Sequence, residues 1–307
     1  MKAVVMPRYG GAQDLRTAET PEPAPGPGEA LIRLEATSVN PVDRELAAGR
    51  LDSIVPAEFP LIPGWDAAGT VAEVGSEVTE YAAGDHVLGY VRRPVARWGT
   101  YAEYTVAEPR MIAPKPDFMD WDSAAGLPLA GLTALQALEA VALKDAETVL
   151  VHAAAGGVGS IAVQIAKARG ARVVGTASRR NHDYLVALGA EPVEYGDGLL
   201  ERVRRLVPDG IDAALDAVGA GEVDLSIRAG ADPSRVVSIA DPKVREKGGE
   251  YVFTEPRSED LRALTALAES RQLIVPVSAV FPLERAAEAW EAGRTGGARG
   301  KTVLRMA

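Results

Sequence analysis

The chain of 307 residues carries a formal net charge of -10, with 47% hydrophobic and 25% charged residues. This length predicts two domains with sizeable cores, because a domain usually holds about 100–200 residues. The acidic balance argues against a nucleic-acid partner, since that interaction depends on Lys and Arg facing phosphates. The sequence has no cysteine and three separated histidines, which excludes a disulfide framework and argues against a zinc catalyst.

The sequence pattern shows no targeting or membrane segment. The N-terminal residues MKAVVMPRYGG lack the apolar core of a secretory signal. The longest apolar stretch, from Ser123 to Leu143, is interrupted by Pro128, Gln136 and Glu139, so we expect a buried helix at a domain interface rather than a membrane span. These features predict a cytoplasmic protein with no membrane partner.

The first third of the chain consists of short β-branched runs separated by Gly and Pro. The runs are KAVVM, EALIRLEATSV, GTVAEVG, DHVLGYV and TYAEYTV. Short strands at this spacing are typical of a twisted, barrel-like antiparallel unit. We therefore predict a mainly-β domain in this part of the chain.

From about Trp121, apolar strand runs alternate with helical patterns. The strand runs are TVLVHAA, ARVVGTA, EPVEY, IDAALDAV, SRVVSIA and EYVFT. This alternation predicts parallel βαβ units in a doubly wound nucleotide-binding sheet with helices on both faces. The last runs, LIVPVSAVF and GKTVLRM, have no such partner and should return to complete the first domain. The predicted domains are residues 1–120 together with 270–307, and residues 121–269.

A glycine-rich turn follows the first strand of the second domain. In VLVHAAAGGVGS, Gly156, Gly157 and Gly159 stand between that strand and a helix, with Ala154 at the first position of the dinucleotide spacing. Glycine lets the backbone approach a pyrophosphate, and the N–H groups of the helix N-terminus bind the anion. We therefore expect the turn to bind the cofactor through Ala155, Gly156, Gly157 and Val158.

The residues after the next strand indicate which dinucleotide binds. NAD-binding domains place an acidic residue about 20 positions beyond the glycines, where it accepts hydrogen bonds from the ribose 2′-OH. Here Ala177 stands near that place and is followed by Ser178, Arg179 and Arg180. The missing carboxylate and the added donors favour a 2′-phosphate. We predict NADP(H) as the cofactor, held by Ser178 and Arg179, with the part of Arg180 left open.

Several motifs in this order resemble one family along essentially the whole chain. They are SVNPVDRELAAG, PGWDAAGTVAEVGSEV, GDHVLGY, GTYAEYTV, LPLAGLTALQAL, the glycine-rich turn, GIDAALDAVG and the closing GKTVL. The chain resembles the zinc-independent quinone oxidoreductase branch of the medium-chain dehydrogenase/reductases, which includes ζ-crystallin. The resemblance implies an α/β fold: a doubly wound parallel Rossmann sheet plus a GroES-like, barrel-like, mainly-β catalytic domain.

The same resemblance removes the metal from the expected mechanism. Zinc-using members of the superfamily bind the metal through a cysteine and through the histidine of a Gly-His-Glu motif. This chain has Asn40 near the first place, Trp65 at the second and Asp66 after it. An indole offers no lone pair to a metal, so we expect NADPH to deliver hydride to an intrinsically electrophilic acceptor. Such acceptors are quinones and other α,β-unsaturated carbonyls.

The resemblance also implies individual site residues. Asn40, Asp43 and Thr133 are expected in the catalytic site, with Asn40 and Thr133 also touching the nicotinamide end of the cofactor. The alternatives are a turn residue before Pro41 for Asn40 and a helix N-cap for Thr133. Further positions implied to contact the cofactor are Tyr195, Val218, Ala240 and Phe253.

Two other functions fit the same motifs. One is an enoyl-thioester reductase of polyketide type, because such enzymes share the glycine-rich turn. The other is a non-enzymatic NADPH-binding protein with a crystallin-like or regulatory role. The resemblance further implies a homodimer, and we expect the exposed strand EYVFT to form its interface.

Overall fold

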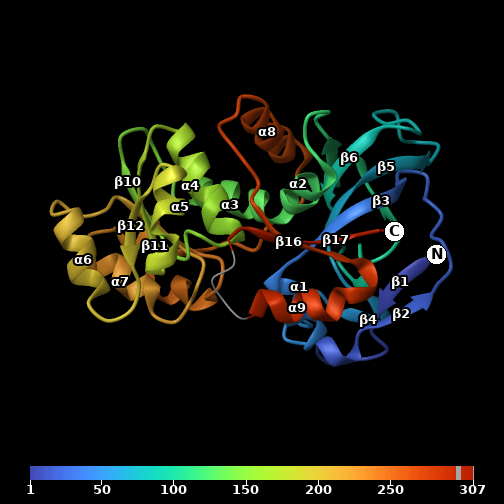
Figure 1. Cartoon of the computed structure of the whole chain (residues 1–307), viewed down its shortest axis with the longest axis horizontal. Helices are drawn as coiled ribbons and strands as arrows, with labels where there is room; N and C mark the ends of the chain where they lie inside the picture. Colours follow the sequence, from blue (N-terminus) through green and yellow to red (C-terminus); the bar gives the residue numbers. More distant parts are fainter. Residues whose placement is uncertain (295–298, 307) are drawn as a thin grey trace.

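The two largest sheets of the protein lie in separate lobes (Figure 1). The computed structural model describes residues 1–294 and 299–306. The chain passes from the first lobe to the second through α2 (Trp121–Gly126) and α3 (Pro128–Ala140). It returns before β16 (Val277–Pro282) and ends in β17 (Lys301–Arg305).

Six parallel strands form the sheet of the lobe at the left of Figure 1. Their order is β12-β11-β10-β13-β14-β15, and every neighbouring pair is parallel, which confirms the predicted doubly wound sheet. The order reverses at β10, and ligands of such sheets bind outside the carboxyl ends of the strands at that point. The strands are β10 (Thr148–Val151), β11 (Arg172–Ala177), β12 (Glu191–Glu194), β13 (Ala213–Asp216), β14 (Val236–Ser238) and β15 (Glu250–Tyr251).

Helices cover both faces of this sheet, because neighbouring residues of a strand point to opposite sides. Val149 and Val151 of β10 belong to the larger apolar core, which includes residues of α3 and α4 (Gly157–Ala168). Leu150 between them belongs to a second core, formed with α6 (Leu199–Leu206) and α7 (Glu222–Arg228). The two covered faces leave the carboxyl edge of the sheet as the place where a ligand has access.

The second large sheet has seven strands and is mainly antiparallel. Its strand β3 (Ala30–Val39) pairs with β5 (Asp66–Val74), β8 (Tyr104–Ala107) and β17. Register shifts between β3 and β5 are of the kind that bends a sheet. As predicted, β16 and β17 return to this lobe and complete the sheet. The remaining members are β6 (His86–Tyr90) and β9 (Ile112–Pro114), and two small pairs are β1 (Lys2–Val5) with β2 (Arg16–Glu19) and β4 (Ala57–Ile62) with β7 (Ala96–Trp98).

The apolar stretch from Ser123 to Leu143 forms two helices rather than the single helix that we expected. α2 ends at Gly126 and α3 begins at Pro128, because proline has no N–H and fits only the first turn of a helix. α3 is buried along most of its length and contacts α4, β6 and α8 (Ser258–Glu269). Within the described residues, no helix is long and apolar enough to cross a membrane.

Short helices complete the mainly-β lobe. α1 (Pro41–Ala47) follows β3 directly, and α9 (Ala286–Arg294) lies beside it in Figure 1. α2 also contacts this lobe, through β3, β5 and β17, although the predicted division assigned it to residues 121–269. The domain bounds therefore stay a prediction. On the other lobe, α5 (His182–Ala187) contacts β12.

Candidate active site and cofactor groove

The glycine-rich turn lies at the carboxyl end of β10, where the sheet order reverses. Gly156 caps α4 in an extended conformation, and the first N–H groups of a helix have no intrahelical acceptor. A Cβ atom on Gly159 would overlap the carbonyl oxygen of Ala153, so this close packing of turn and helix requires glycine. The turn therefore offers the backbone donors and the positive helix end that a pyrophosphate needs.

A groove of about 390 Å³ runs from this turn across the carboxyl edge of the sheet. Its walls are the turn, the end of β11 and the loops that follow β12 and β13. The predicted cofactor residues that line it are Ala155, Gly156, Ser178, Tyr195 and Val218. The lining residues absent from our prediction are Ala153, Thr176, Ala177, Asn181, Gly196 and Glu222.

Two polar side chains at the groove have buried atoms without a hydrogen-bond partner in the described part of the chain. These atoms are Ser178 Oγ and Glu222 Oε2. Burial, followed by the charge of Asp216, raises the pKa of Glu222. Buried polar atoms are nearly always satisfied in folded proteins, so these two fit a groove that a polar ligand completes. Tyr195 and Val218, which are 59% and 46% exposed, add apolar surface to its walls.

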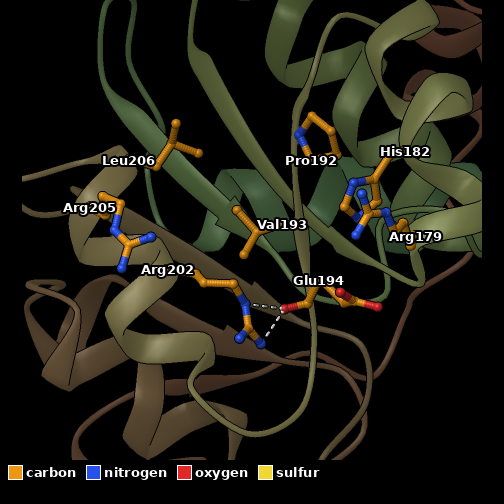
Figure 2. Close-up of a pocket in the computed structure, with 8 residues that line it drawn as sticks. All are labelled: Arg179, His182, Pro192, Val193, Glu194, Arg202, Arg205 and Leu206. Carbon is orange, nitrogen blue, oxygen red and sulfur yellow. Dashed lines mark hydrogen bonds between the residues drawn. The ribbon is translucent and has the colours of Figure 1, made fainter.

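A second pocket, of about 440 Å³, lies along β12. Figure 2 shows Arg179 and His182 on one side of it and Arg202 and Arg205 on the other. Arg202 is committed to the carbonyl oxygen of Glu194, to which its Nε donates at 3.0 Å and its Nη2 at 2.8 Å.

Arg179 lies directly after Ser178, at the boundary between the groove and this second pocket. Its guanidinium makes no hydrogen bond or ion pair with any residue that the structure describes, whereas Arg180 has an interaction of its own. Arg179 is therefore the arginine available beside Ser178 for an anion.

Asn40 and Asp43 lie in the mainly-β lobe, where β3 ends and α1 begins. The backbone N–H of Asn40 donates to Asp43 Oδ2 at 2.8 Å, and the Tyr101 hydroxyl donates to the same oxygen at 2.9 Å. Trp290 of α9 donates in turn to the Tyr101 hydroxyl at 3.0 Å. Burial raises the pKa of Asp43 to about 7, against the lowering effect of both hydrogen bonds. Asp43 is thus a buried acid at the start of α1, and it does not line the groove.

Asp66, at the start of β5, connects several elements through its two oxygens. Oδ1 accepts from the backbone N–H of Leu129 at 2.7 Å, and Oδ2 accepts from Ser38 Oγ at 2.5 Å and from Asn40 Nδ2 at 2.8 Å. Lys301 Nζ lies 3.7 Å from Oδ2 and donates to the side-chain oxygen of Asn40. Both ends of the Asn40 amide are therefore engaged inside the protein.

Lys301 is a residue of this network that our sequence analysis missed. Its side chain is only 4% exposed, and burial lowers its pKa while the charges of Asp66 and Asp43 act in the opposite direction. The signal was a charged residue at the start of the apolar strand GKTVL, which we interpreted as a strand alone. Its position beside Asn40 follows from the register of β17 with β3, in which Thr302 faces Val39.

Thr133 lies in the second turn of α3, so the alternative of a helix N-cap is wrong. Its hydroxyl donates to the carbonyl oxygen of Leu129 at 2.6 Å and lies 2.6 Å from Thr254 Oγ1. Phe253 lies under the guanidinium of Arg92, with 5.0 Å between the carbon of that group and the ring centroid.

Ala240 is exposed, near Gly219 at the edge of the sheet. Gly157 and Val158 form the first turn of α4. These positions, like Thr133 and Phe253, do not line the groove itself, and their cofactor contacts stay predictions.

Trp65 stands where zinc-using dehydrogenases carry a histidine. Its side chain is 4% exposed, and its ring meets that of Tyr90 edge-on at a centroid distance of 6.1 Å. The neighbouring oxygens of Asn40 and Asp66 already accept hydrogen bonds from protein groups. Across residues 1–294 and 299–306, no cluster of three or more His, Asp or Glu is arranged to hold a metal ion.

The sheet, the groove and the buried polar network define a class of protein. The parallel sheet offers a dinucleotide site at its carboxyl edge, and the mainly-β lobe contributes a buried polar network that reaches the glycine-rich turn through Gly300. This is the architecture of a two-domain dehydrogenase or reductase that works with a nicotinamide dinucleotide.

Comparison with known proteins identifies the family. Residues 26–117 match the family described as alcohol dehydrogenase GroES-like domain, and residues 188–304 match zinc-binding dehydrogenase. The chain therefore belongs to the quinone oxidoreductase branch of the medium-chain dehydrogenase/reductase superfamily, as its motifs indicated. The GroES-like match also confirms the predicted type of the mainly-β lobe.

Individual relatives support this assignment along the whole chain. A chloroplast envelope quinone oxidoreductase homolog of Arabidopsis thaliana is 33% identical, over 96% of this chain and 95% of its own length. An NADPH-dependent alkenal/one oxidoreductase of the same plant is 32% identical, over 99% of this chain and 79% of its own. The structure of the quinone oxidoreductase from Coxiella burnetii superposes with a TM-score of 0.87 at 34% identity, covering 99% of both chains.

Proposed function

We propose that this protein transfers hydride from NADPH to a quinone or another α,β-unsaturated carbonyl without using a metal ion. One relative is named for quinones and another for NADPH and alkenals or enones, which supports this pair of substrates. A quinone accepts the hydride and takes a proton from solvent to become a hydroquinone. In an enone the hydride adds to the β-carbon, and a proton completes the saturated carbonyl compound.

The observation that carries the proposal is the filled polar network at Asn40. Its side-chain oxygen accepts from Lys301 and its nitrogen donates to Asp66, so neither atom is open to a metal. One matching family is described as zinc-binding, but here Trp65 offers no metal ligand beside these two residues. An acceptor that is electrophilic by itself fits such a site best, because no metal ion is then present to polarise the carbonyl of an ordinary ketone.

The cofactor half of the proposal rests on the groove. The glycine-rich turn would hold the pyrophosphate, and Ser178 with Arg179 would hold the 2′-phosphate through charge-assisted hydrogen bonds. Ala177 stands in place of the acid at the end of β11, so that position carries no carboxylate that would repel the phosphate. When bound, the reduced nicotinamide supplies the hydride, and the side chains of this protein orient it and exclude competing water.

A steady-state assay tests the proposal. The loss of reduced-nicotinamide absorbance is followed with NADPH and with NADH, each against a quinone, an enone and an enoyl thioester, with and without a chelator. We expect turnover of the quinone or enone with NADPH, unchanged by the chelator. Preference for the enoyl thioester would favour the polyketide-type reductase, and tight NADPH binding without turnover would favour the non-enzymatic role. Loss of activity on chelation would overturn the metal-free mechanism.

We also propose a cytoplasmic homodimer with domains 1–120 plus 270–307 and 121–269. β15 is the last strand at one edge of the six-stranded sheet, and no further strand of the part of the chain that the structure describes pairs with its outer side, so a second chain could pair there. Sedimentation velocity at micromolar concentration should then report two chains per particle, and a monomer would contradict the dimer.

Fractionation of cells that express the protein tests its proposed cytoplasmic location. Limited proteolysis between residues 120 and 121 or 269 and 270 tests the proposed division into domains.

A further inference from the structure

We propose that Lys301 is a positioning residue for hydride transfer: its ammonium holds Asn40 and Asp66 of the mainly-β lobe in a fixed arrangement beside the glycine-rich turn of the other lobe. The inference rests on the proposed function, because it gives Lys301 a part in that reaction. Nothing in the motifs that carry the family resemblance assigns this residue a role beyond its strand.

The backbone around Lys301 is attached to the cofactor turn. Gly300 forms a β-bridge with Gly156, and its N–H donates to the carbonyl oxygen of Ala155 at 3.2 Å. The aliphatic part of Lys301 then passes Gly157, where an added Cβ would lie 2.9 Å from Lys301 Cδ. Any larger residue at Gly157 would push this side chain aside. The start of α4 therefore leaves room for the side chain of Lys301 to reach the polar network of the mainly-β lobe.

The charged end of Lys301 lies among oxygens of the mainly-β lobe. It donates to Asn40 Oδ1 and lies 3.7 Å from Asp66 Oδ2. Because an ammonium only donates, it fixes which end of the Asn40 amide is the oxygen, and Nδ2 then faces Asp66 Oδ2 at 2.8 Å and the carbonyl oxygen of Ser38 at 3.3 Å. The ammonium thereby orders the oxygens around it and compensates the buried charge of Asp66.

The ionisable groups that act on this ammonium are acids. They are Asp66 of β5 and Asp43 of α1, both buried, and their charges favour the protonated form of Lys301 against the effect of burial. The aspartates face Lys301 from two different elements, so loss of the ammonium proton would leave them without a counter-ion. The arrangement of Asn40 and Asp66 should therefore be lost at alkaline pH, and the rate of hydride transfer should fall there.

The test compares the wild-type protein with Lys301→Met, which keeps the length of the side chain and removes its charge. The double variant Lys301→Met with Asp66→Asn removes both charges, and Lys144→Met at an exposed site is the matched control. NADPH affinity and stoichiometry are measured by fluorescence titration. The rate of a single turnover with benzoquinone is measured by stopped flow from neutral to alkaline pH.

We expect Lys301→Met to lower the single-turnover rate by roughly 30-fold, with the Kd for NADPH changed less than about threefold, because the reacting groups lose their alignment rather than the cofactor its site. Its rate should also lose the alkaline fall of the wild type. Removing the charge of Asp66 as well should restore part of the rate, and Lys144→Met should behave as wild type.

Three results would overturn the inference. One is a Lys301→Met rate equal to that of the wild type. Another is a lower rate explained entirely by fewer NADPH-binding chains, which would mean that Lys301 only supports folding. The third is wild-type protein that binds NADPH but transfers no hydride to any acceptor, and that result alone would also overturn the proposed function.

Discussion

Asp66 of β5 accepts a hydrogen bond from the backbone N–H of Leu129 at 2.7 Å, and this bond joins the mainly-β lobe to α3. Leu129 lies in the first turn of α3, where backbone N–H groups lack intrahelical acceptors and the helix dipole favours a carboxylate. Asp66 therefore has a structural task that needs no metal. The same carboxylate also receives Asn40 and Ser38, so one residue connects the lobe junction with the polar network.

Replacement of Arg179 should weaken the binding of NADPH but not that of NADH. In Arg179→Ala the Kd for NADPH should rise about tenfold or more, while that for NADH should stay nearly unchanged, because a charge-assisted hydrogen bond to the 2′-phosphate is lost. Fluorescence titration with both dinucleotides measures the effect. Arg180→Ala serves as the comparison, and a selective loss of NADPH affinity in that variant instead would assign the phosphate to Arg180.

Gly159 should not tolerate even one added carbon. The Cβ of Gly159→Ala would overlap the backbone carbonyl of Ala153, so the turn must move away from α4. We expect NADPH affinity to fall at least about tenfold, together with a lower melting temperature. Gly28→Ala is the control, because its Cβ would meet only Glu77 Oε2, at 4.0 Å. Equal NADPH affinity in both variants would contradict this account of the turn.

Asp43 should make the protein less stable as the pH rises. Its pKa is raised by burial to about 7, above the value near 3.8 in the unfolded chain, so the folded state holds the proton more tightly between these values. Stability present at low pH is therefore lost as the pH rises toward 7. Urea unfolding should show that Asp43→Asn removes on the order of 2–3 kcal/mol of this change between about pH 5 and pH 8. An identical pH dependence of the free energy of unfolding in wild type and variant would contradict the raised pKa of Asp43.

His152 should make the protein less stable as the pH falls, which is opposite to the effect of Asp43. Burial lowers its pKa to about 4 from the ordinary value of 6.5, so the unfolded chain binds the proton more readily between those values. The contribution of neutral His152 to the free energy of unfolding is fully present above pH 6.5 and is lost as the pH drops toward 4. His152→Gln should therefore flatten the loss of unfolding free energy in that window by about 3 kcal/mol. The glutamine is chosen because it can still reach Ser226, which lies 2.9 Å from His152 Nε2. A loss of the same size in both proteins would show that other groups control acid unfolding.

The fold could be predicted to a large extent, because its signals are local. Consecutive residues such as Val149 and Leu150 enter different cores, and an unbroken apolar run bounded by helices is the pattern of a strand buried on both faces. The break between α2 and α3 was not predicted. Pro128 interrupts the apolar stretch, but we expected one helix there, whereas the structure starts a new helix at this proline.

The candidate site was predicted unevenly. Gly156 and Ser178 line the groove as expected, since a strand followed by glycines and a helix specifies its own backbone geometry. Glu222 and Asn181 were missed, because they reach the groove from segments whose composition carries no special signal. Asn40 was expected to touch the ligand, yet its amide is engaged by Lys301 and Asp66, and such partners can be identified only in space.

The sequence by itself determined the two lobes and the glycine-rich turn, because these depend on residue type and short-range spacing, and its resemblance to the family put Trp65 at the place of a metal-binding histidine. The tertiary structure decided what occupies the polar site instead. Lys301 and Asn40 are 261 positions apart and meet because β17 pairs with β3, so their contact depends on a strand register that no local pattern encodes. The burial that lowers the pKa of Lys301 and raises that of Asp43 likewise exists only once distant segments of the chain are packed around these side chains.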